Sequence, residues 1–234
     1  MFRSILLNIL LFAFMSVYVL CGIFILPFSE RVAYKYWFIF SDIFKFITKH
    51  VGKIDFTIEN EHYLKTDGRV IFASRHESMW ETLAFISLFP KPVFVMKKEL
   101  HQIPLFGCLA DKVNSIYVDR EKGLKAIIEV SRQVSAALDR GCQVIIFPEG
   151  TRMPSGEFVP LKRGISLFYK QNNCKIVPII HNSGKFWARR SFKKNPGTVT
   201  VKFMEPIEPG LPQDEFMDKL NSIFQTEISK LENK

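Results

Sequence analysis

Apolar and polar residues alternate along the chain in blocks whose length and period predict its elements. The first block is ILLNILLFAFMSVYVLCGIFILPF, residues 5–28, and it contains no charged residue. As a helix rising ~1.5 Å per residue it reaches about 36 Å, enough to cross a ~30 Å hydrocarbon layer. We therefore expect this segment in lipid. A cleaved signal peptide is the alternative, but the run is longer than the apolar part of such a peptide and no A-x-A-like site follows it.

The second block, RVAYKYWFIFSDIFKFITKHVGK at residues 31–53, mixes basic with aromatic and aliphatic residues. This composition predicts a basic amphipathic helix that lies among lipid headgroups, with an ordinary core helix as the alternative. Pro27 permits a sharp turn between the two blocks, so the first helix either spans the membrane or re-enters it. We expect residues 1–52 to form a membrane-associated two-helix segment. Positive residues are denser after the first block than before it, which places the bulk of the chain in the cytoplasm.

From residue 53 onward, short β-rich runs alternate with helical periodicity. This alternation predicts an α/β domain over residues 53–234, with a mixed, mostly parallel sheet flanked by helices. The expected strands are 56–59, 70–73, 93–96, 115–118, 143–147, 176–180 and 198–203. The expected helices are 80–89, 123–138, 164–171 and 214–231. Gly141 is expected to end the second of these helices.

The formal net charge of +9 predicts an anionic partner, which a membrane surface, a phosphorylated substrate or nucleic acid would each provide. The segment KFWARRSFKK, residues 185–194, concentrates five basic residues among aromatic ones. It suits anionic lipid, an acidic carrier protein or single-stranded nucleic acid, and a solvated loop is the plainer interpretation. The membrane segment and the lack of a recognisable nucleic-acid-binding module argue against nucleic acid.

The cysteines offer no chemistry of their own. The four cysteines are widely spaced and form no CxxC pair, so neither a disulfide nor a metal site is expected. Their apolar surroundings predict buried thiols in a reducing compartment.

Polar motifs follow three of the expected strands. His76 follows one strand, Arg120 a second, and Glu149 with Arg152 a third. In α/β sheets, residues beyond the carboxyl ends of the strands converge on the ligand crevice. Separate segments of the sequence are therefore expected to build one site.

The stretch SRHESMWETLAF, residues 74–85, allows three interpretations of its histidine and glutamate. A zinc site of the H-E-x-x-H type needs its second histidine where Trp80 stands, so this motif is absent. Ser78 and Glu81 have the spacing of a capping box at the start of a helix. If His76 lies in the loop before that helix, the chain reversal can instead bring its ring to the Glu81 carboxylate. Both roles for Glu81 stay open.

These motifs, in this order, resemble those of the membrane glycerolipid acyltransferases. The first family motif is a histidine followed after four residues by an acidic residue, as in HESMWE, residues 76–81. The others are similar to NSIYVDR at 114–120, FPEGTR at 147–152 and VPII at 177–180. The chain departs from the family pattern at three positions: Glu81 replaces the usual Asp, Arg75 replaces Asn, and Asn114 replaces Gly. Asn tolerates a positive φ best among the remaining residues.

The resemblance implies transfer of an acyl group from an acyl-carrier protein or acyl-coenzyme A to a hydroxyl of lysophosphatidic acid, without a cofactor and without an acyl-enzyme. His76 is then the general base, because a neutral imidazole suits proton abstraction near neutral pH. Glu81 orients the imidazole, with Glu77 in reserve. Ser78 is the rival nucleophile, although it suits a helix cap better.

The substrate phosphate calls for cations, and Arg captures phosphate in a bidentate manner better than Lys does. Arg120 and Arg152 are the candidates, with Lys97 in support. Gly150 would let the backbone approach the substrate closely, and Thr151 belongs to the same motif. Glu149 is expected to orient an arginine or the acceptor. The expected substrate-binding residues are Lys97, Arg120, Glu149, Gly150, Thr151 and Arg152.

Alternatives remain for the acceptor and for the class of protein. Glycerol-3-phosphate or another lysophospholipid would need a differently shaped pocket, which the sequence does not reveal. A non-catalytic lipid-binding protein would not need the complete set of polar motifs. The expected location is a membrane, with the catalytic domain on the cytoplasmic face, as at a bacterial inner membrane.

Overall fold

The computed structural model describes residues 1–119, 121 and 123–233, and its centre is a seven-stranded sheet ordered β1-β7-β6-β2-β5-β3-β4. The strands are β1 (Ile54–Glu59), β2 (Val70–Ser74), β3 (Pro92–Lys97), β4 (Ile116–Val118), β5 (Gln143–Ile146), β6 (Lys175–His181) and β7 (Gly197–Phe203). Every neighbouring pair is parallel except β6 with β7. The predicted mixed, mostly parallel sheet is therefore confirmed. The central strands are nearly continuous apolar runs because parallel strands are buried on both faces.

The helices that showed clear periodicity are present at the expected places. They are α5 (Leu124–Asp139), α6 (Gly164–Asn172) and α8 (Gln213–Glu232), while the helix expected at 80–89 divides into α3 (Trp80–Ala84) and the 3₁₀ turn η3 (Phe85–Ser87). Shorter elements that the sequence did not reveal are η2 (Glu61–Lys65), η4 (Lys98–Gln102), α4 (Phe106–Asp111) and α7 (Ser183–Phe186). Such short elements are too brief to establish a hydrophobic period.

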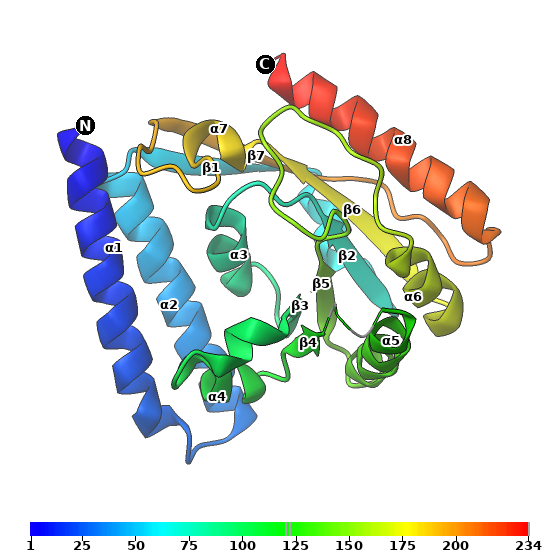
Figure 1. Cartoon of the computed structure of the whole chain (residues 1–234), viewed down its shortest axis with the longest axis horizontal. Helices are drawn as coiled ribbons and strands as arrows, with labels where there is room; N and C mark the ends of the chain where they lie inside the picture. Colours follow the sequence, from blue (N-terminus) through cyan, green and yellow to red (C-terminus); the bar gives the residue numbers. More distant parts are fainter. Residues whose placement is uncertain (120, 122, 234) are drawn as a thin grey trace.

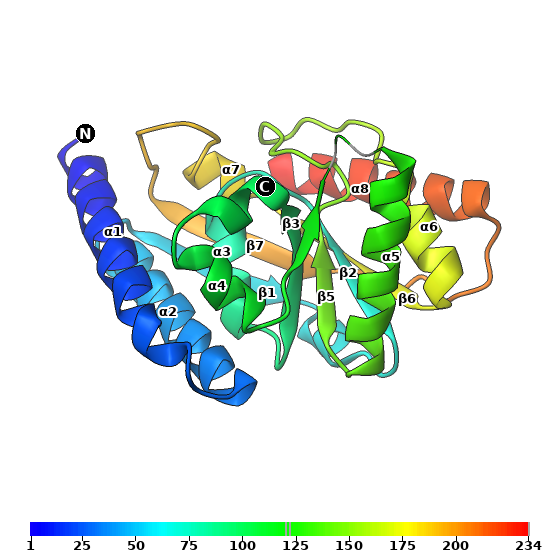
Figure 2. The same cartoon turned by 60° about the horizontal axis from the view of Figure 1, so that its bottom comes forward.

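Two layers of helices enclose the sheet (Figure 1). On one face, α5, α6 and α8 bury side chains such as Val134, Phe168 and Phe224 against the strands. On the other face, α3 and the N-terminal helices contribute Trp80, Phe44 and others to a second apolar cluster. Figure 2 shows the same arrangement from a turned view, with α1 and α2 on one side of the sheet and α5, α6 and α8 on the other.

The N-terminal helices α1 (Phe2–Cys21) and α2 (Glu30–His50) lie side by side and are joined through the 3₁₀ turn η1 (Gly22–Ile25). Helix α2 is amphipathic and buries Trp37, Phe40 and Phe44 toward the protein. Within the described residues, Phe2–Ile25 is long and apolar enough to cross a membrane, and most of its surface is not covered by protein. This exposed apolar surface is consistent with membrane association.

Two backbone predictions are confirmed and one prediction about the cysteines is wrong. Gly141, directly after α5, has φ +71°, and Asn114 has φ +56°, the left-handed region that Gly and Asn adopt most readily. The expectation that all four cysteines are buried fails for two of them. Cys21 and Cys108 are exposed because they lie on outer faces of helices α1 and α4, and all four thiols are free.

Candidate active site

The carboxyl ends of three adjacent parallel strands position the polar motifs. In the order β2-β5-β3, the residues after β2 include His76, those after β5 include Glu149 to Arg152, and β3 itself ends at Lys97. The predicted convergence of separate segments on one edge of the sheet thus occurs for these motifs. Arg120, the remaining predicted phosphate ligand, lies outside the described residues.

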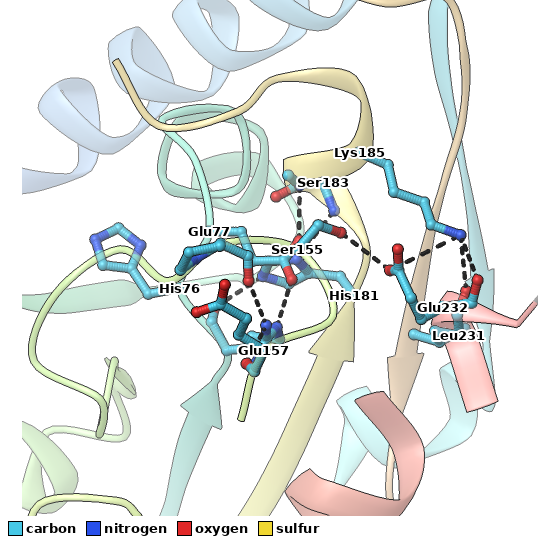
Figure 3. Close-up of polar contacts among 12 residues, drawn as sticks. His76, Glu77, Ser155, Glu157, His181, Ser183, Lys185, Leu231 and Glu232 are labelled. Carbon is cyan, nitrogen blue, oxygen red and sulfur yellow. Dashed lines mark hydrogen bonds and ion pairs between the residues drawn. The ribbon is translucent and has the colours of Figure 1, made fainter. Parts of the chain in front are cut away.

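His76 and Glu81 form the contact that the sequence left open. The His76 Nδ1 lies 2.8 Å from Glu81 Oε1. Because an ionised carboxylate only accepts hydrogen bonds, this contact places the proton on Nδ1 and leaves Nε2 as the basic nitrogen. No described residue hydrogen bonds to Nε2. The ring stacks on Phe147, with centroids 4.3 Å apart, and its side chain is 16% exposed. Figure 3 shows the ring pointing away from the buried groups around Glu77 and Ser183.

Glu81 also has the structural role that its spacing predicted. Its carboxylate accepts hydrogen bonds from the backbone N–H groups of Glu77 and Ser78, and from the hydroxyls of Ser78 and Ser183. The capping box forms only in part: the Ser78 hydroxyl accepts from the Trp80 N–H, and α3 begins at Trp80 as expected, but Met79 and not Ser78 takes the N-cap position. Glu81 therefore caps the helix and orients His76 at the same time.

This network holds Glu81 in its ionised form. Burial alone would raise the pKa of the Glu81 carboxyl, but the hydrogen bond from His76 and the charges of His181 and His76 outweigh burial and hold that pKa far below its usual range. A permanent carboxylate at this position fixes the tautomer of His76 and stabilises the imidazolium that forms when Nε2 takes a proton.

The imidazole opens into a cavity of about 430 Å³. Its floor includes His76 and Phe147, and the motif residues Gly150, Thr151 and Arg152 line it together with Lys97. Gly150 has φ +72°, a conformation that favours glycine. The Arg152 Nε is buried and has no hydrogen-bond partner among the described residues, so it is free to donate to a ligand. The rest of the wall is mainly apolar and comes from α2, α3, β3 and α4, including Trp37, Leu83, Phe94 and Phe106.

Glu149 does not line this cavity but lies behind it. Its Oε2 accepts the His76 backbone N–H at 2.6 Å, and its Oε1 accepts from Arg75 Nη1 at 3.1 Å. The expectation that Glu149 orients an arginine is met by Arg75, not by a residue of the cavity. Burial raises the pKa of Glu149 to about 8, although Arg75 and the His76 N–H favour the ionised form. Both oxygens face donors, which fits a carboxylate that depends on Arg75.

Arg75 connects the first motif to the third. Its guanidinium is fully buried, pairs with Glu77 and Glu149, and donates to the backbone carbonyls of Pro154 and Glu157 at 2.9 and 2.8 Å. The Met153 N–H donates to the His76 carbonyl at 2.7 Å, which adds a second link between the two motifs. These contacts hold the loop that carries Arg152 against the segment that carries His76.

Glu77 has a role that was not considered from the sequence, and Ser78 serves the start of α3 and not as a nucleophile. Glu77, the reserve partner for His76, pairs with Arg75 and accepts the Gly184 N–H at 2.7 Å. Burial raises the pKa of Glu77, while the charges of His181 and Arg75 act in the opposite direction. The Ser78 hydroxyl is fully buried and engaged by Glu81 and Trp80, so it has no access to a substrate in the cavity.

Two basic residues that line the cavity were not among the predicted site residues. Arg189 and Arg190 line the cavity from the segment after α7. The sequence identified them only as part of a basic stretch, because nothing in the local pattern links that stretch to His76. The C-terminal end of α8 contacts both α7 and the loop after β5. The Glu232 carbonyl accepts from Lys185 at 2.8 Å, and the Glu232 carboxylate accepts from Ser155 at 3.1 Å (Figure 3).

Comparisons with known proteins identify relatives of this chain. An acyltransferase family model matches residues 55–182. The chain is 33% identical over 181 residues to 1-acyl-sn-glycerol-3-phosphate acyltransferase from Pseudomonas aeruginosa, covering 76% of this chain and 68% of that protein. It is 32% identical over 154 residues to the enzyme of that name from Cocos nucifera, covering 65% of this chain and 49% of the relative.

A solved structure has the same fold across the whole chain. The crystal structure of the 1-acyl-sn-glycerophosphate (LPA) acyltransferase PlsC from Thermotoga maritima superposes with a TM-score of 0.83, covering 100% of this chain and 98% of that one at 18% identity. The matched family segment contains the His76–Glu81 pair, the FPEGTR loop and the strand β6 that flanks them. On this match and the identity to the Pseudomonas enzyme, the chain belongs to the acyltransferase family.

Proposed function

We propose that this protein transfers a fatty acyl group from an acyl thioester to the sn-2 hydroxyl of lysophosphatidic acid and so produces phosphatidic acid. One observation carries the proposal: a carboxylate-oriented imidazole with a free Nε2 shares a largely apolar cavity with an arginine whose Nε has no partner among the described residues. The names of the Pseudomonas and coconut relatives support the same acceptor.

In this reaction, His76 Nε2 removes the proton of the lipid hydroxyl as its oxygen attacks the thioester carbonyl carbon. A C–O bond forms, the tetrahedral intermediate collapses, the C–S bond breaks, and the leaving thiolate takes a proton from the imidazolium. Glu81 holds the ring in place and stabilises its positive charge. No protein nucleophile is required, in keeping with the buried and engaged Ser78.

Arg152 and Lys97 are proposed to bind the phosphate of the acceptor, while the apolar wall accommodates hydrocarbon. The phosphate of lysophosphatidic acid is only a few bonds from the reacting hydroxyl, so its ligands have to lie near His76. Arg152 satisfies this requirement because the next residue, Met153, is hydrogen bonded to the His76 carbonyl. Gly150 and Thr151 line the cavity beside it.

The remaining parts of the proposal concern the membrane and the donor. The two-helix segment, residues 1–52, would attach the α/β domain, residues 53–234, to the cytoplasmic face of a membrane such as a bacterial inner membrane. The exposed apolar surface of Phe2–Ile25 supports this attachment. The donor is an acyl-carrier protein thioester or acyl-coenzyme A.

A panel of acceptors tests the proposal. Purified protein is expected to acylate lysophosphatidic acid in preference to glycerol-3-phosphate, lysophosphatidylcholine and monoacylglycerol. Arg152→Gln is expected to raise the KM for lysophosphatidic acid about 10- to 100-fold, because it removes charge-assisted hydrogen bonds to phosphate. The slow reaction with monoacylglycerol, which has no phosphate, should not fall further. Steady-state kinetics measure both effects.

Lys162→Gln is the matched control, because Lys162 is exposed on the same loop and does not line the cavity. It is expected to behave as wild type. Preference for glycerol-3-phosphate or another lysolipid would replace the acceptor assignment. The absence of any acyl transfer by the wild type would instead leave a non-catalytic lipid-binding protein.

A further inference from the structure

The charge of the cavity lining exceeds what the acceptor requires. Lys97, Arg152, Arg189 and Arg190 all line the cavity, and none of the described residues lining it is Asp or Glu. One phosphate monoester needs about two positive charges, which Lys97 and Arg152 already supply. The other two cations come from a separate segment of the chain, the loop after α7. They are therefore available to a second anionic ligand.

Arg189 and Arg190 are held at the cavity but are not neutralised. The Arg189 Nη1 donates to the Arg152 carbonyl at 3.0 Å, which brings the two loops together. Neither Arg189 nor Arg190 takes part in an ion pair within the described part of the chain. Both are exposed, so a solvent-borne group can reach them.

The loop that carries these arginines is anchored to the first helix. The Ser4 hydroxyl accepts the Lys194 N–H at 3.0 Å, Asn8 donates to the Phe192 carbonyl at 2.9 Å, and Lys194 itself is buried over the Trp187 ring. These contacts fix the loop to α1 and to Trp187, directly after α7. The arginines therefore lie on a segment that is already fixed by its contacts, which lowers the entropic cost of binding a ligand.

The distance of each substrate's phosphate from the reacting atoms indicates which ligand the two arginines bind. The acceptor phosphate lies a few bonds from the attacking oxygen, whereas the donor phosphate lies a full pantetheine arm away from the thioester. The donor phosphate therefore has to sit at the cavity rim, near solvent, where a carrier protein or nucleotide stays outside. We propose that Arg189 and Arg190 form the subsite for the phosphate of the donor's phosphopantetheine. This inference rests on the proposed function, since it names the donor site of the same reaction.

Three thioester donors test this subsite. Palmitoyl-coenzyme A and palmitoyl-acyl-carrier protein carry the phosphate, whereas palmitoyl-N-acetylcysteamine does not. The variant Arg189→Gln/Arg190→Gln is expected to raise the KM for both phosphorylated donors about 10- to 100-fold. Its rate with palmitoyl-N-acetylcysteamine should match that of wild type. Arg190→Gln alone keeps the contact between Arg189 and the Arg152 carbonyl, so it should leave the KM for lysophosphatidic acid unchanged. Arg189→Lys/Arg190→Lys keeps the charge and should recover part of the loss.

Lys193→Gln is the control, because Lys193 is an exposed basic residue of the same loop that does not line the cavity. It should leave all donors unaffected. With Arg190→Gln, a higher KM for lysophosphatidic acid with every donor would assign the arginines to the acceptor and overturn the inference. A loss confined to one of the two phosphorylated donors would also overturn it, because the ligand would then be the nucleotide or the carrier surface.

A binding measurement separates this inference from the proposed function. Coenzyme A binding by calorimetry needs no turnover, and the double glutamine variant should weaken it about 10-fold or more. Weaker binding in the variant supports the subsite even if the wild type fails to acylate lysophosphatidic acid. Unchanged coenzyme A binding, with wild-type donor KM, rejects the subsite and leaves the proposed function standing.

Discussion

His76→Ala is expected to lower kcat/KM for acyl transfer about 10²- to 10⁴-fold, which is the usual contribution of a positioned general base. The variant should still fold. Glu81 keeps four other donors when the imidazole is removed, namely the N–H groups of Glu77 and Ser78 and the hydroxyls of Ser78 and Ser183. No buried carboxylate is left without partners, so the thermal unfolding midpoint should stay close to that of wild type. The loss is then chemical.

His62→Ala is the control for this experiment, because His62 is exposed on η2 and does not line the cavity. It should retain wild-type kinetics. Near-normal turnover by His76→Ala would remove the imidazole from the mechanism. A large fall in its unfolding midpoint would show that the residue acts mainly through folding.

Arg75→Gln is expected to reduce the free energy of unfolding by about 3–5 kcal/mol, because removing one partner of a buried ion pair leaves uncompensated charge in the interior. Here two buried carboxylates, Glu77 and Glu149, would lose the guanidinium that pairs with both, and the loop carbonyls of Pro154 and Glu157 would lose donors. Urea unfolding in detergent measures the change. Arg163→Gln, which breaks an exposed pair with Asp214, is the control and should have little effect.

The sign of the pH dependence provides a second readout for Arg75→Gln. Burial raises the pKa of Glu149 in the folded protein from 4.5 to about 8, so its contribution to stability is present at low pH and is lost as pH rises through that window. Without Arg75, the Glu77 and Glu149 carboxyl groups become even harder to ionise. The loss of unfolding free energy in the variant should therefore be smaller at pH 5 than at pH 8. Adding Glu77→Gln and Glu149→Gln should restore much of the stability. An equal deficit at both pH values, with no restoration, would exclude buried charge as the cause.

The elements that follow from local pattern were predicted from the sequence. The central β-strands are nearly continuous apolar runs, and every strand lies within two residues of its expected position. Gly141 and Asn114 adopt the positive φ that their residue types favour. The contact between His76 and Glu81 was also predictable, because the two residues are five positions apart and the helix starts between them.

The parts that depend on distant segments were not predictable. Arg75 was only a departure from a family motif, since its partner Glu149 and the carbonyls it binds are more than 70 positions away. Arg189 reaches the cavity because β6 places the loop after α7 beside the loop after β5, which no local period reveals. Local sequence thus identifies the proposed base and a carboxylate that can orient it, whereas the buried contacts of Arg75 and the arginines at the cavity come from tertiary packing.

The role of His76 as the base is tested most directly by the structure of the protein bound to lysophosphatidic acid. No thioester is added, so the acceptor cannot react. The measured quantity is the distance from the sn-2 hydroxyl oxygen to His76 Nε2. We predict a hydrogen bond of about 2.6–3.2 Å, with the phosphate on Arg152. A lipid bound elsewhere, or a phosphate on Arg152 with the hydroxyl out of reach of the imidazole, would contradict it.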